Sequence, residues 1–352
     1  MDDFAEHGAR VGLKRVPRSR PECGDLVFEG GGVKGIGLVG AFEELEKQRW
    51  APKGVAGTSA GAITAALVAA GCSAAELRET VFTMPLEEFK DATLADRLPL
   101  IGPGLSVLRN RGIYRGDYFL NWMRKELEKQ GITHFGQLVN EDAENENQRY
   151  RLRVIASDVT ERRMLVLPND ADVLGIEPDE LEIAYAVRMS MSIPFFFKPV
   201  VHKNRKTRKE HVIVDGGLLS NFPVWLFDCE GRDPRWPTFG ARLVEPEPSM
   251  AIGHRVSGQD GGLRRGSLAD YIKSLALTMM EAHDRLYIDR VTFARTISIK
   301  TLGVGTTEFD ISEERMKALY ESGRKAAKDF LAGFNWDEYV AARHEPQLRR
   351  AA

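Results

Sequence analysis

The stretch GTSAG at residues 57–61 matches the pattern G-x-S-x-G, in which a serine occupies a sharp turn between a buried strand and a helix. The flanks fit this turn, since residues 55–56 end a short apolar strand and residues 62–70 predict a helix that is apolar on all sides. The two glycines leave room where side chains would clash as strand and helix meet. The Ser59 hydroxyl would then lie at a helix N-terminus, whose free N–H groups favour negative charge. A turn that merely packs a helix on a sheet is the alternative interpretation.

A glycine run precedes this turn by one predicted helix. Residues 30–35 read GGGVKG, and they follow an apolar strand over 25–28 and precede a helix over 36–48. Consecutive glycines leave backbone N–H groups uncovered. The loop can therefore cradle an anion, either a phosphate or the oxyanion of an acyl-transfer intermediate.

The same loop also fits the dinucleotide-binding fingerprint G-x-G-x-x-G. That fingerprint requires an acidic residue at the end of the second strand, where this chain has Gly57 and Thr58. A Walker loop is excluded, because Ile36 follows Gly35 where lysine and then serine or threonine are required. An oxyanion loop is the better interpretation, and a nucleotide-binding oxidoreductase remains the alternative from a different class.

A third motif, Asp215-Gly216-Gly217, follows the β-branched run at residues 211–214, which predicts a buried strand. On its own the motif is typical of a plain turn. Together with the first two motifs, it supplies the base that a serine nucleophile needs. An aspartate at its reference pKa of about 3.9 is a poor base at neutral pH, so burial would have to raise that pKa.

Together the three motifs resemble those of the patatin-like phospholipase family, which follow one another as G-G-G-x-[K/R]-G, G-x-S-x-G and D-G-[A/G]. The resemblance spans residues 24–223 and includes Ser190, Pro194 and Phe197, which match the family's Ser-x-x-x-Pro-x-x-Phe stretch. It implies an α/β fold, a three-layer sandwich with a central, mostly parallel sheet related to the α/β-hydrolases. It also implies hydrolysis of fatty-acyl esters of phospholipids or lysophospholipids, with no metal and no cofactor.

The resemblance also implies roles for individual residues. Ser59 would be the nucleophile that forms an acyl-Ser59 intermediate, and Asp215 would be its base in a Ser–Asp dyad. The expected oxyanion-loop and motif residues are Gly30, Gly31, Gly32, Lys34, Gly35, Gly57, Gly61, Gly216 and Gly217. Lys34 fills the family's basic position and would add positive potential near acyl or phosphate oxygens; a solvated lysine at a helix start is the alternative.

A histidine could complete a catalytic triad with Ser59 and Asp215. Of the seven histidines, His254 and His283 are candidates because both follow Asp215, as the chain order Ser, Asp, His requires. Neither lies in a recognisable catalytic context, so the dyad is preferred to a triad. No histidine spacing indicates a metal site.

Composition sets broad limits. With 352 residues and 43% hydrophobic content, the chain can form one large α/β domain or two small ones. The net charge of −2 gives no general argument for nucleic-acid binding. No signal-peptide core and no membrane-length apolar run is found, and the three cysteines lack metal or redox spacing. We therefore expect a cytoplasmic protein that contacts membranes peripherally.

The chain divides into three parts in this interpretation. Residues 1–22 form a basic, flexible arm, residues 23–335 form the phospholipase domain, and residues 336–352 form a C-terminal tail. Within the domain, residues 85–116 mix apolar residues with prolines and glycines, which favours a lid over the pocket or a packed surface connection. Other predicted elements are helices over 74–83, 117–130, 268–290 and 312–331, and strands over 151–157, 164–167 and 291–299.

Two stretches bear on lipid contact. Residues 203–209 carry five cations between two apolar pairs, which predicts a hairpin tip that meets anionic headgroups or is simply solvated. The phenylalanines at 195–197 are candidates for an acyl-chain pocket, with at least one in the core. The expected partners are thus lipid and membrane, not nucleic acid. A variant of the function, an effector or toxin activated by a protein or small ligand, stays open, as does the oligomeric state.

Overall fold

The computed structural model describes residues 22–91, 112–141, 143, 148–228, 233–245, 290–306 and 308–344. The predicted N-terminal arm, apart from Glu22, lies outside these residues. So do the middle of the predicted lid, the predicted helix over 268–290 apart from its last residue, and the two candidate triad histidines, His254 and His283.

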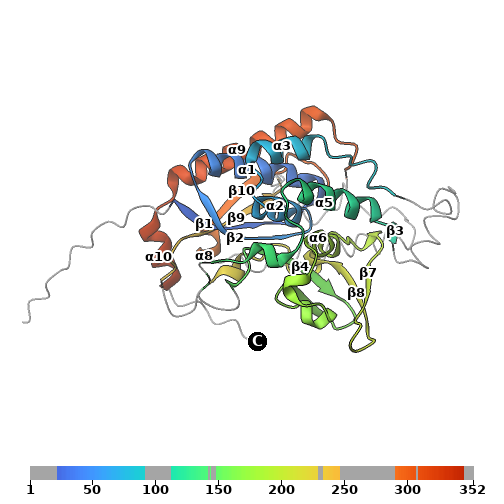
Figure 1. Cartoon of the computed structure of the whole chain (residues 1–352). Coiled ribbons are helices and arrows are strands. Elements are labelled where there is room, and N and C mark those ends of the chain that lie inside the picture. The colour runs from blue at the N-terminus through green and yellow to red at the C-terminus, as the bar shows by residue number, and fades with distance from the viewer. Residues whose placement is uncertain are drawn as a thin grey trace, which may run out of the picture.

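A central sheet organises the described part of the chain (Figure 1). Its eight strands are β1 (Cys23–Phe28), β2 (Ala51–Thr58), β4 (Leu152–Asp158), β5 (Arg163–Leu167), β7 (Val200–Lys203), β8 (Glu210–Asp215), β9 (Thr238–Val244) and β10 (Thr296–Lys300). They are ordered β10-β9-β1-β2-β4-β8-β7, with β5 also paired to β4. The first five in this order run parallel, whereas β5, β7 and β8 pair in antiparallel fashion.

Helices flank this sheet. They are α1 (Ile36–Lys47), α2 (Ala60–Ala69), α3 (Ala74–Phe82), α5 (Asp117–Lys129), α6 (Ile183–Ser190), α8 (Arg290–Ala294), α9 (Glu313–Gly333) and α10 (Trp336–His344). One face of the sheet lies under α1, α2, α3 and α9 (Figure 1). On the opposite face, Val27 and Ala56 pack against Phe222 and the short helix η7 (Val224–Phe227). The chain therefore has the predicted α/β architecture, a mostly parallel central sheet between helices.

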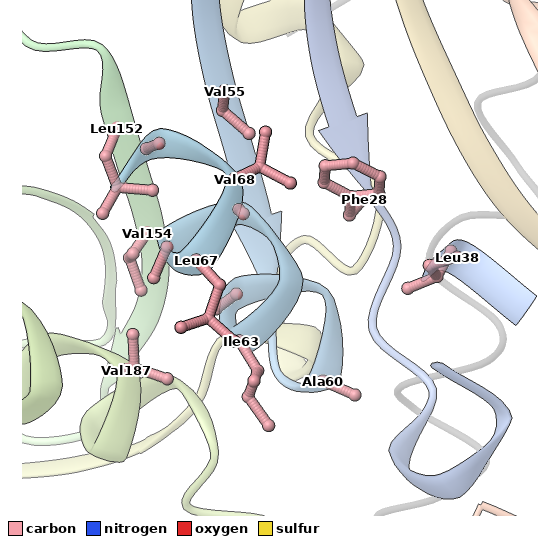
Figure 2. Close-up of a cluster of buried hydrophobic side chains, with 14 of the residues drawn as sticks. Phe28, Leu38, Val55, Ala60, Ile63, Leu67, Val68, Leu152, Val154 and Val187 are labelled. Carbon is pink, nitrogen blue, oxygen red and sulfur yellow. The ribbon is translucent and has the colours of Figure 1, made fainter. Parts of the chain in front are cut away.

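Helix α2 anchors the serine turn to the sheet. All ten of its residues are buried, which is possible because nearly all are small or apolar. Figure 2 shows Ile63, Leu67 and Val68 of this helix among side chains of the neighbouring strands and helices, including Val55 and Val154. Because α2 begins directly after Ser59, this packing holds the serine at the carboxyl end of β2.

The register along β4 places two strands end to end. Thr58, the last residue of β2, pairs with Ile155, and Asp215, the last residue of β8, pairs with Ala156. Strand β5 occupies one edge of β4 along this whole stretch. Each edge of a strand takes one partner at a given residue, so β2 and β8 share the other edge, with their carboxyl ends meeting.

Two predictions about the C-terminal part hold only in part. The β-branched run at 291–299 predicts one strand, but the chain forms α8 and then β10, and Arg295 between them forms an ion pair of 2.5 Å with Asp228. The stretch predicted as a tail from 336 forms α10. Trp336 and Tyr339 of this helix stack 5.5 Å apart and are buried, so the packed chain extends to this helix.

Short elements complete the fold near the site. β3 (Gly112–Tyr114) pairs in parallel with β6 (Phe195–Phe197) as a separate small sheet. The hairpin predicted around residues 203–209 is confirmed, since β7 and β8 pair in antiparallel register on either side of it. Among the described residues, no helix combines the length and the apolar character needed to cross a bilayer.

Candidate active site

Ser59 occupies a sharp turn at the end of β2. Its backbone has φ 53° and ψ −127°, a conformation that non-glycine residues rarely adopt and that functional sites hold under strain. The two motif glycines make room for it. A Cβ at Gly57 would lie 2.2 Å from the Gly61 carbonyl oxygen, and one at Gly61 would lie 2.2 Å from the Phe28 carbonyl oxygen. Larger residues at 57 and 61 would displace the turn from the sheet.

The last residue of α6 and the residue after it hold Ser59 from the other side. The Ser59 N–H donates to Ser190 Oγ at 2.8 Å, and the Ser59 hydroxyl donates to Met191 Sδ at 3.5 Å. Both bonds are buried, and Ser59 itself is 2% exposed. A thioether sulfur is a weak acceptor, so the hydroxyl is oriented but only weakly restrained.

Asp215 is completely buried at the end of β8. One carboxylate oxygen, Oδ1, accepts the Gly217 N–H at 2.8 Å, while the Asp215 N–H donates to the Ser192 carbonyl at 2.9 Å. The other oxygen, Oδ2, has no hydrogen-bond partner among the described residues. Burial raises the pKa of Asp215 from its ordinary 3.8 to about 7, against the opposing effect of hydrogen bonds from the Ser59 side chain and the Gly217 N–H.

Ser59 and Asp215 are therefore neighbours. The Ser59 side chain acts on the pKa of Asp215 as a hydrogen-bond partner, yet its hydroxyl lies against Met191 and Asp215 Oδ2 is unpartnered. Their contact is thus longer or less well aligned than an ordinary hydrogen bond. This is common in sites without substrate, where such bonds tighten when the reactant binds.

The glycine loop lies directly beside Ser59. A Cβ at Gly30 would be 3.1 Å from Ser59 Cβ and 2.2 Å from Asn221 Oδ1. Gly30 and Asn221 form a reciprocal pair: the Gly30 N–H donates to the Asn221 carbonyl at 3.1 Å, and Asn221 Nδ2 donates to the Gly30 carbonyl at 3.0 Å. The Gly30 N–H is therefore occupied and does not serve as an oxyanion donor in this arrangement.

The next two glycines remain as donor candidates. Within the part of the chain that the structure describes, the N–H groups of Gly31 and Gly32 make no hydrogen bond. Gly32 has φ 57°, and a Cβ there would lie 2.0 Å from the Thr306 carbonyl oxygen, so only glycine fits. Gly35 follows in the same turn, where a Cβ would approach Ala60 Cβ at 3.1 Å.

Lys34 does not point freely at the site. Its ammonium forms an ion pair with Glu245 at 3.0 Å, and its side chain is only 11% exposed. The expected positive potential near the acyl oxygens is thus offset by this carboxylate, and the solvated alternative does not describe Lys34 either. Its observed contact joins the turn after β1 to the residue that follows β9.

An apolar cavity opens next to Ser59. Its empty volume, which includes open solvent at its mouth, is about 530 Å³. It is lined by Gly32, Val33, Gly35, Ile36, Ala60, Ile63, Thr64, Val81, Met84, Leu86, Phe89, Met191 and Phe309. The lining includes the glycine loop, the residue after Ser59 and the Met191 that contacts the serine hydroxyl. The phenylalanines at 195–197 are not part of it, although Phe196 stacks on Phe309 at 5.1 Å.

Three residues of this site carried no predicted role. Ser190 belongs to a stretch that matched a family pattern, but nothing in the pattern said that its hydroxyl accepts the Ser59 N–H. Met191 and Asn221 gave no signal, because both act through contacts with residues more than 130 positions away. Among the described residues, no group of three or more histidine, cysteine, aspartate or glutamate side chains is arranged to hold a metal ion.

Comparison with known proteins agrees with the fold. The family model described as patatin-like phospholipase matches residues 26–228, more than half of the chain. The Bacillus subtilis protein named "Uncharacterized protein YqhO" is 36% identical over 311 residues, covering 87% of this chain and 97% of that protein. The mimivirus protein named "Uncharacterized protein R571" is 25% identical over 321 residues, covering 88% of this chain and 94% of that protein.

The chain belongs to the patatin-like phospholipase family. Among solved structures, VipD from Legionella pneumophila superposes with a TM-score of 0.50 at 20% identity, covering 89% of this chain and 67% of that chain. This likeness concerns the fold. Family membership makes the chain a lipid hydrolase at family level and removes the basis for the dinucleotide-binding alternative.

Proposed function

We propose that this protein hydrolyses fatty-acyl esters of phospholipids or lysophospholipids through an acyl-Ser59 intermediate, with Asp215 as the base. The observation that carries the proposal is the pairing of a strained, buried serine with a buried aspartate whose pKa is about 7. A base works best when its pKa lies near the working pH, and this carboxylate meets that condition. Its unpartnered Oδ2 is an open acceptor for the serine proton.

The reaction follows from these groups. Asp215 takes the proton of the Ser59 hydroxyl as Oγ bonds to the ester carbonyl carbon, and the carbonyl oxygen becomes an oxyanion. The N–H groups of Gly31 and Gly32 stabilise that charge, since they have no other partner among the described residues. The alcohol leaves with the proton from Asp215. Water then attacks the acyl-enzyme and gives a proton to Asp215, which passes that proton to Ser59 Oγ as the bond to the acyl carbon breaks and the fatty acid leaves.

The apolar cavity is the proposed site of the acyl chain. Its wall is formed by aliphatic, methionine and phenylalanine side chains, and it begins at Ala60 and Met191, beside the nucleophile. An acyl chain in the cavity is stabilised because its apolar surface leaves water. Its ester carbon stays next to Ser59. The lipid headgroup would remain toward solvent.

The test is covalent labelling with a fluorophosphonate that carries an alkyl chain. The wild-type protein should label, Ser59→Ala should not, and Asp215→Asn should label at least about 100-fold more slowly, because the serine loses its base. Ser322→Ala is the matched control, since it removes an exposed hydroxyl on α9 and should label like wild type. Hydrolysis of phospholipid vesicles in the presence of a chelator is then measured on the same variants.

Robust labelling of Ser59→Ala would remove the nucleophile assignment. Unchanged labelling of Asp215→Asn would keep the nucleophile but reject the base. One regulated variant of this function has a structural basis: the Ser59 hydroxyl lies on Met191 and must turn toward Asp215. An activating protein or ligand would supply that change, so the wild-type protein would then label fully only in a cell extract that contains the activator.

A further inference from the structure

The hairpin between β7 and β8 has a defined tip. Asn204 is buried there; its Nδ2 donates to the Val173 carbonyl at 3.0 Å, and its Oδ1 accepts the N–H groups of Lys206 and Thr207 at 2.8 and 3.0 Å. The backbone also closes the turn, since the Asn204 N–H donates to the Lys209 carbonyl at 2.9 Å. The cations around this tip are therefore presented by an ordered backbone.

Five cations surround the tip, and all are exposed: Lys203, Arg205, Lys206, Arg208 and Lys209. Lys206 pairs with Glu177 at 2.9 Å, and Lys209 pairs with Glu161. Within the described part of the chain, Lys203, Arg205 and Arg208 form no ion pair. Acidic neighbours are also present: Glu210 lies opposite Lys203 across the hairpin, and Asp172 and Glu180 lie near Lys206. The unpaired positive charge of the hairpin is that of Lys203, Arg205 and Arg208.

Apolar side chains accompany these charges. Val201 is 56% exposed and lies on the same face of β7 as Lys203, two residues away. Val159, 42% exposed, lies in the turn after β4, where its N–H donates to the Val212 carbonyl at 3.0 Å. Val212 is the partner of Val201 in the hairpin register. Exposed valines next to unpaired cations form a surface that fits the headgroup layer of a membrane.

The hairpin extends from the edge of the sheet that carries the site. The last residue of β8, Asp215, pairs with Ala156 of β4. The first residues of β8 extend past Asp158, the last residue of β4, and so they project from the edge where the parallel strands end. At about 3.4 Å per residue, Glu210 lies roughly 17 Å beyond Asp215. In Figure 1, β7 and β8 lie at the opposite end of the molecule from α10.

We propose that the β7–β8 hairpin, with Lys203, Arg205 and Arg208 at its tip, is a docking surface for bilayers that contain anionic phospholipid. This proposal rests on the proposed function in one respect: an enzyme that cleaves membrane lipids must bind a lipid surface. Its chemistry is charge complementarity with phosphate headgroups, assisted by Val201 and Val159. Nucleic acid also offers phosphate, but it offers nothing to exposed valines, so a bilayer is the occupant we argue for.

The experiment measures binding without catalysis. The protein carries Ser59→Ala throughout, and it is sedimented with vesicles of phosphatidylcholine alone or of phosphatidylcholine and phosphatidylglycerol in equal amounts. Binding should require phosphatidylglycerol and weaken as salt is added. Replacing Lys203, Arg205 and Arg208 by glutamine should weaken binding by about fivefold per cation, on the order of 100-fold in total at low salt.

The matched control changes net charge equally elsewhere. Lys317→Gln, Lys325→Gln and Lys328→Gln remove three exposed cations from α9 and should leave vesicle binding within about twofold, because screening confines the interaction to charges near the surface. Circular dichroism checks that each triple variant is folded. Equal loss in both triple variants would show a general charge effect and overturn the proposal.

Two further results would overturn it: equal binding to both kinds of vesicle, and binding to a DNA duplex but not to vesicles. Because Ser59→Ala is catalytically silent by design, these outcomes are independent of whether Ser59 is the nucleophile. A hairpin that fails to bind leaves the labelling test unaffected, and a failed labelling test leaves the binding result interpretable.

Discussion

Thr58 and Asp215 pair with adjacent residues of β4, Ile155 and Ala156, although 157 positions separate them in the chain. The strands β2 and β8 meet end to end along one edge of β4. This backbone pairing brings Ser59, the residue after Thr58, next to Asp215. A slip of one residue in β8 would turn Asp215 to the other face of the sheet. The geometry of the candidate dyad is therefore a property of the sheet register.

The rate of ester hydrolysis should follow the ionisation of Asp215. Only the ionised carboxylate accepts the serine proton, and its pKa is about 7. For a soluble short-chain ester, kcat/KM should rise about tenfold per pH unit below that value and level off above it. A profile measured between about pH 5 and 9 that is flat through neutrality would contradict the assigned base.

Asp215→Asn should stabilise the protein, and more so at high pH. The folded pKa of about 7 exceeds the ordinary 3.8, so the folded state retains a proton that the unfolded chain has lost. The free energy of unfolding contributed by Asp215 therefore falls as pH rises from about 4 to about 7. Asparagine removes this dependence but can still accept the Gly217 N–H.

Thermal unfolding of both proteins at about pH 5 and pH 8 measures this effect. The excess in Tm of Asp215→Asn over wild type should be larger at the higher pH. Asp25, whose pKa burial also raises to about 7, is present in both proteins and cancels in the comparison. A variant that is less stable than wild type at both values would argue against a burial-raised pKa at Asp215.

Asn221→Ala should lower kcat more than it changes KM. The variant loses the bond from Nδ2 to the Gly30 carbonyl, which holds the glycine loop against Ser59. Loss of one oxyanion donor costs about 10²–10³ in rate, and a displaced loop should cost about tenfold to 100-fold. Asn335→Ala, which removes an exposed amide before α10, should behave like wild type in the same assay. An equal rise in KM with unchanged kcat would indicate a substrate-binding role instead.

Val81→Phe should shorten the acyl chains that the protein accepts. Val81 lines the cavity from α3, and a phenyl ring there fills space that a long chain would occupy. The rate with long-chain esters should fall at least about tenfold, while that with butyrate esters changes by less than about threefold. Val139→Phe, at a valine that is 44% exposed and outside the cavity lining, is the matched control. Parallel losses on both chain lengths would count against an acyl-chain cavity.

Local patterns predicted the elements that depend on neighbours in the sequence. The strand, turn and helix around Ser59 follow from small and apolar residues at fixed spacing, and Ser312 caps α9 as predicted, accepting the Arg315 N–H at 3.4 Å. The glycine motifs were informative because their backbone approaches require glycine. Fold class and family could thus be predicted from the sequence.

Contacts between distant segments could not. The ion pair of Lys34 with Glu245 and the bonds between Asn221 and Gly30 depend on which strands become neighbours, a property that no local pattern contains. Helix α10 also depends on such a contact, because its aromatic residues pack against Phe334. The sequence of α10 does not predict a helix without knowledge of this packing. Tertiary packing decided these elements over local propensity.

Oxidation of Met191 would change the hydrogen bonding of Ser59. Met191 forms part of the cavity wall, and its Sδ is the atom on which the Ser59 hydroxyl rests. Peroxide converts a thioether into a sulfoxide, whose oxygen is a much stronger acceptor and whose shape no longer matches an apolar wall. An oxidised molecule would hold its serine proton away from Asp215, and methionine sulfoxide reductase would release it again.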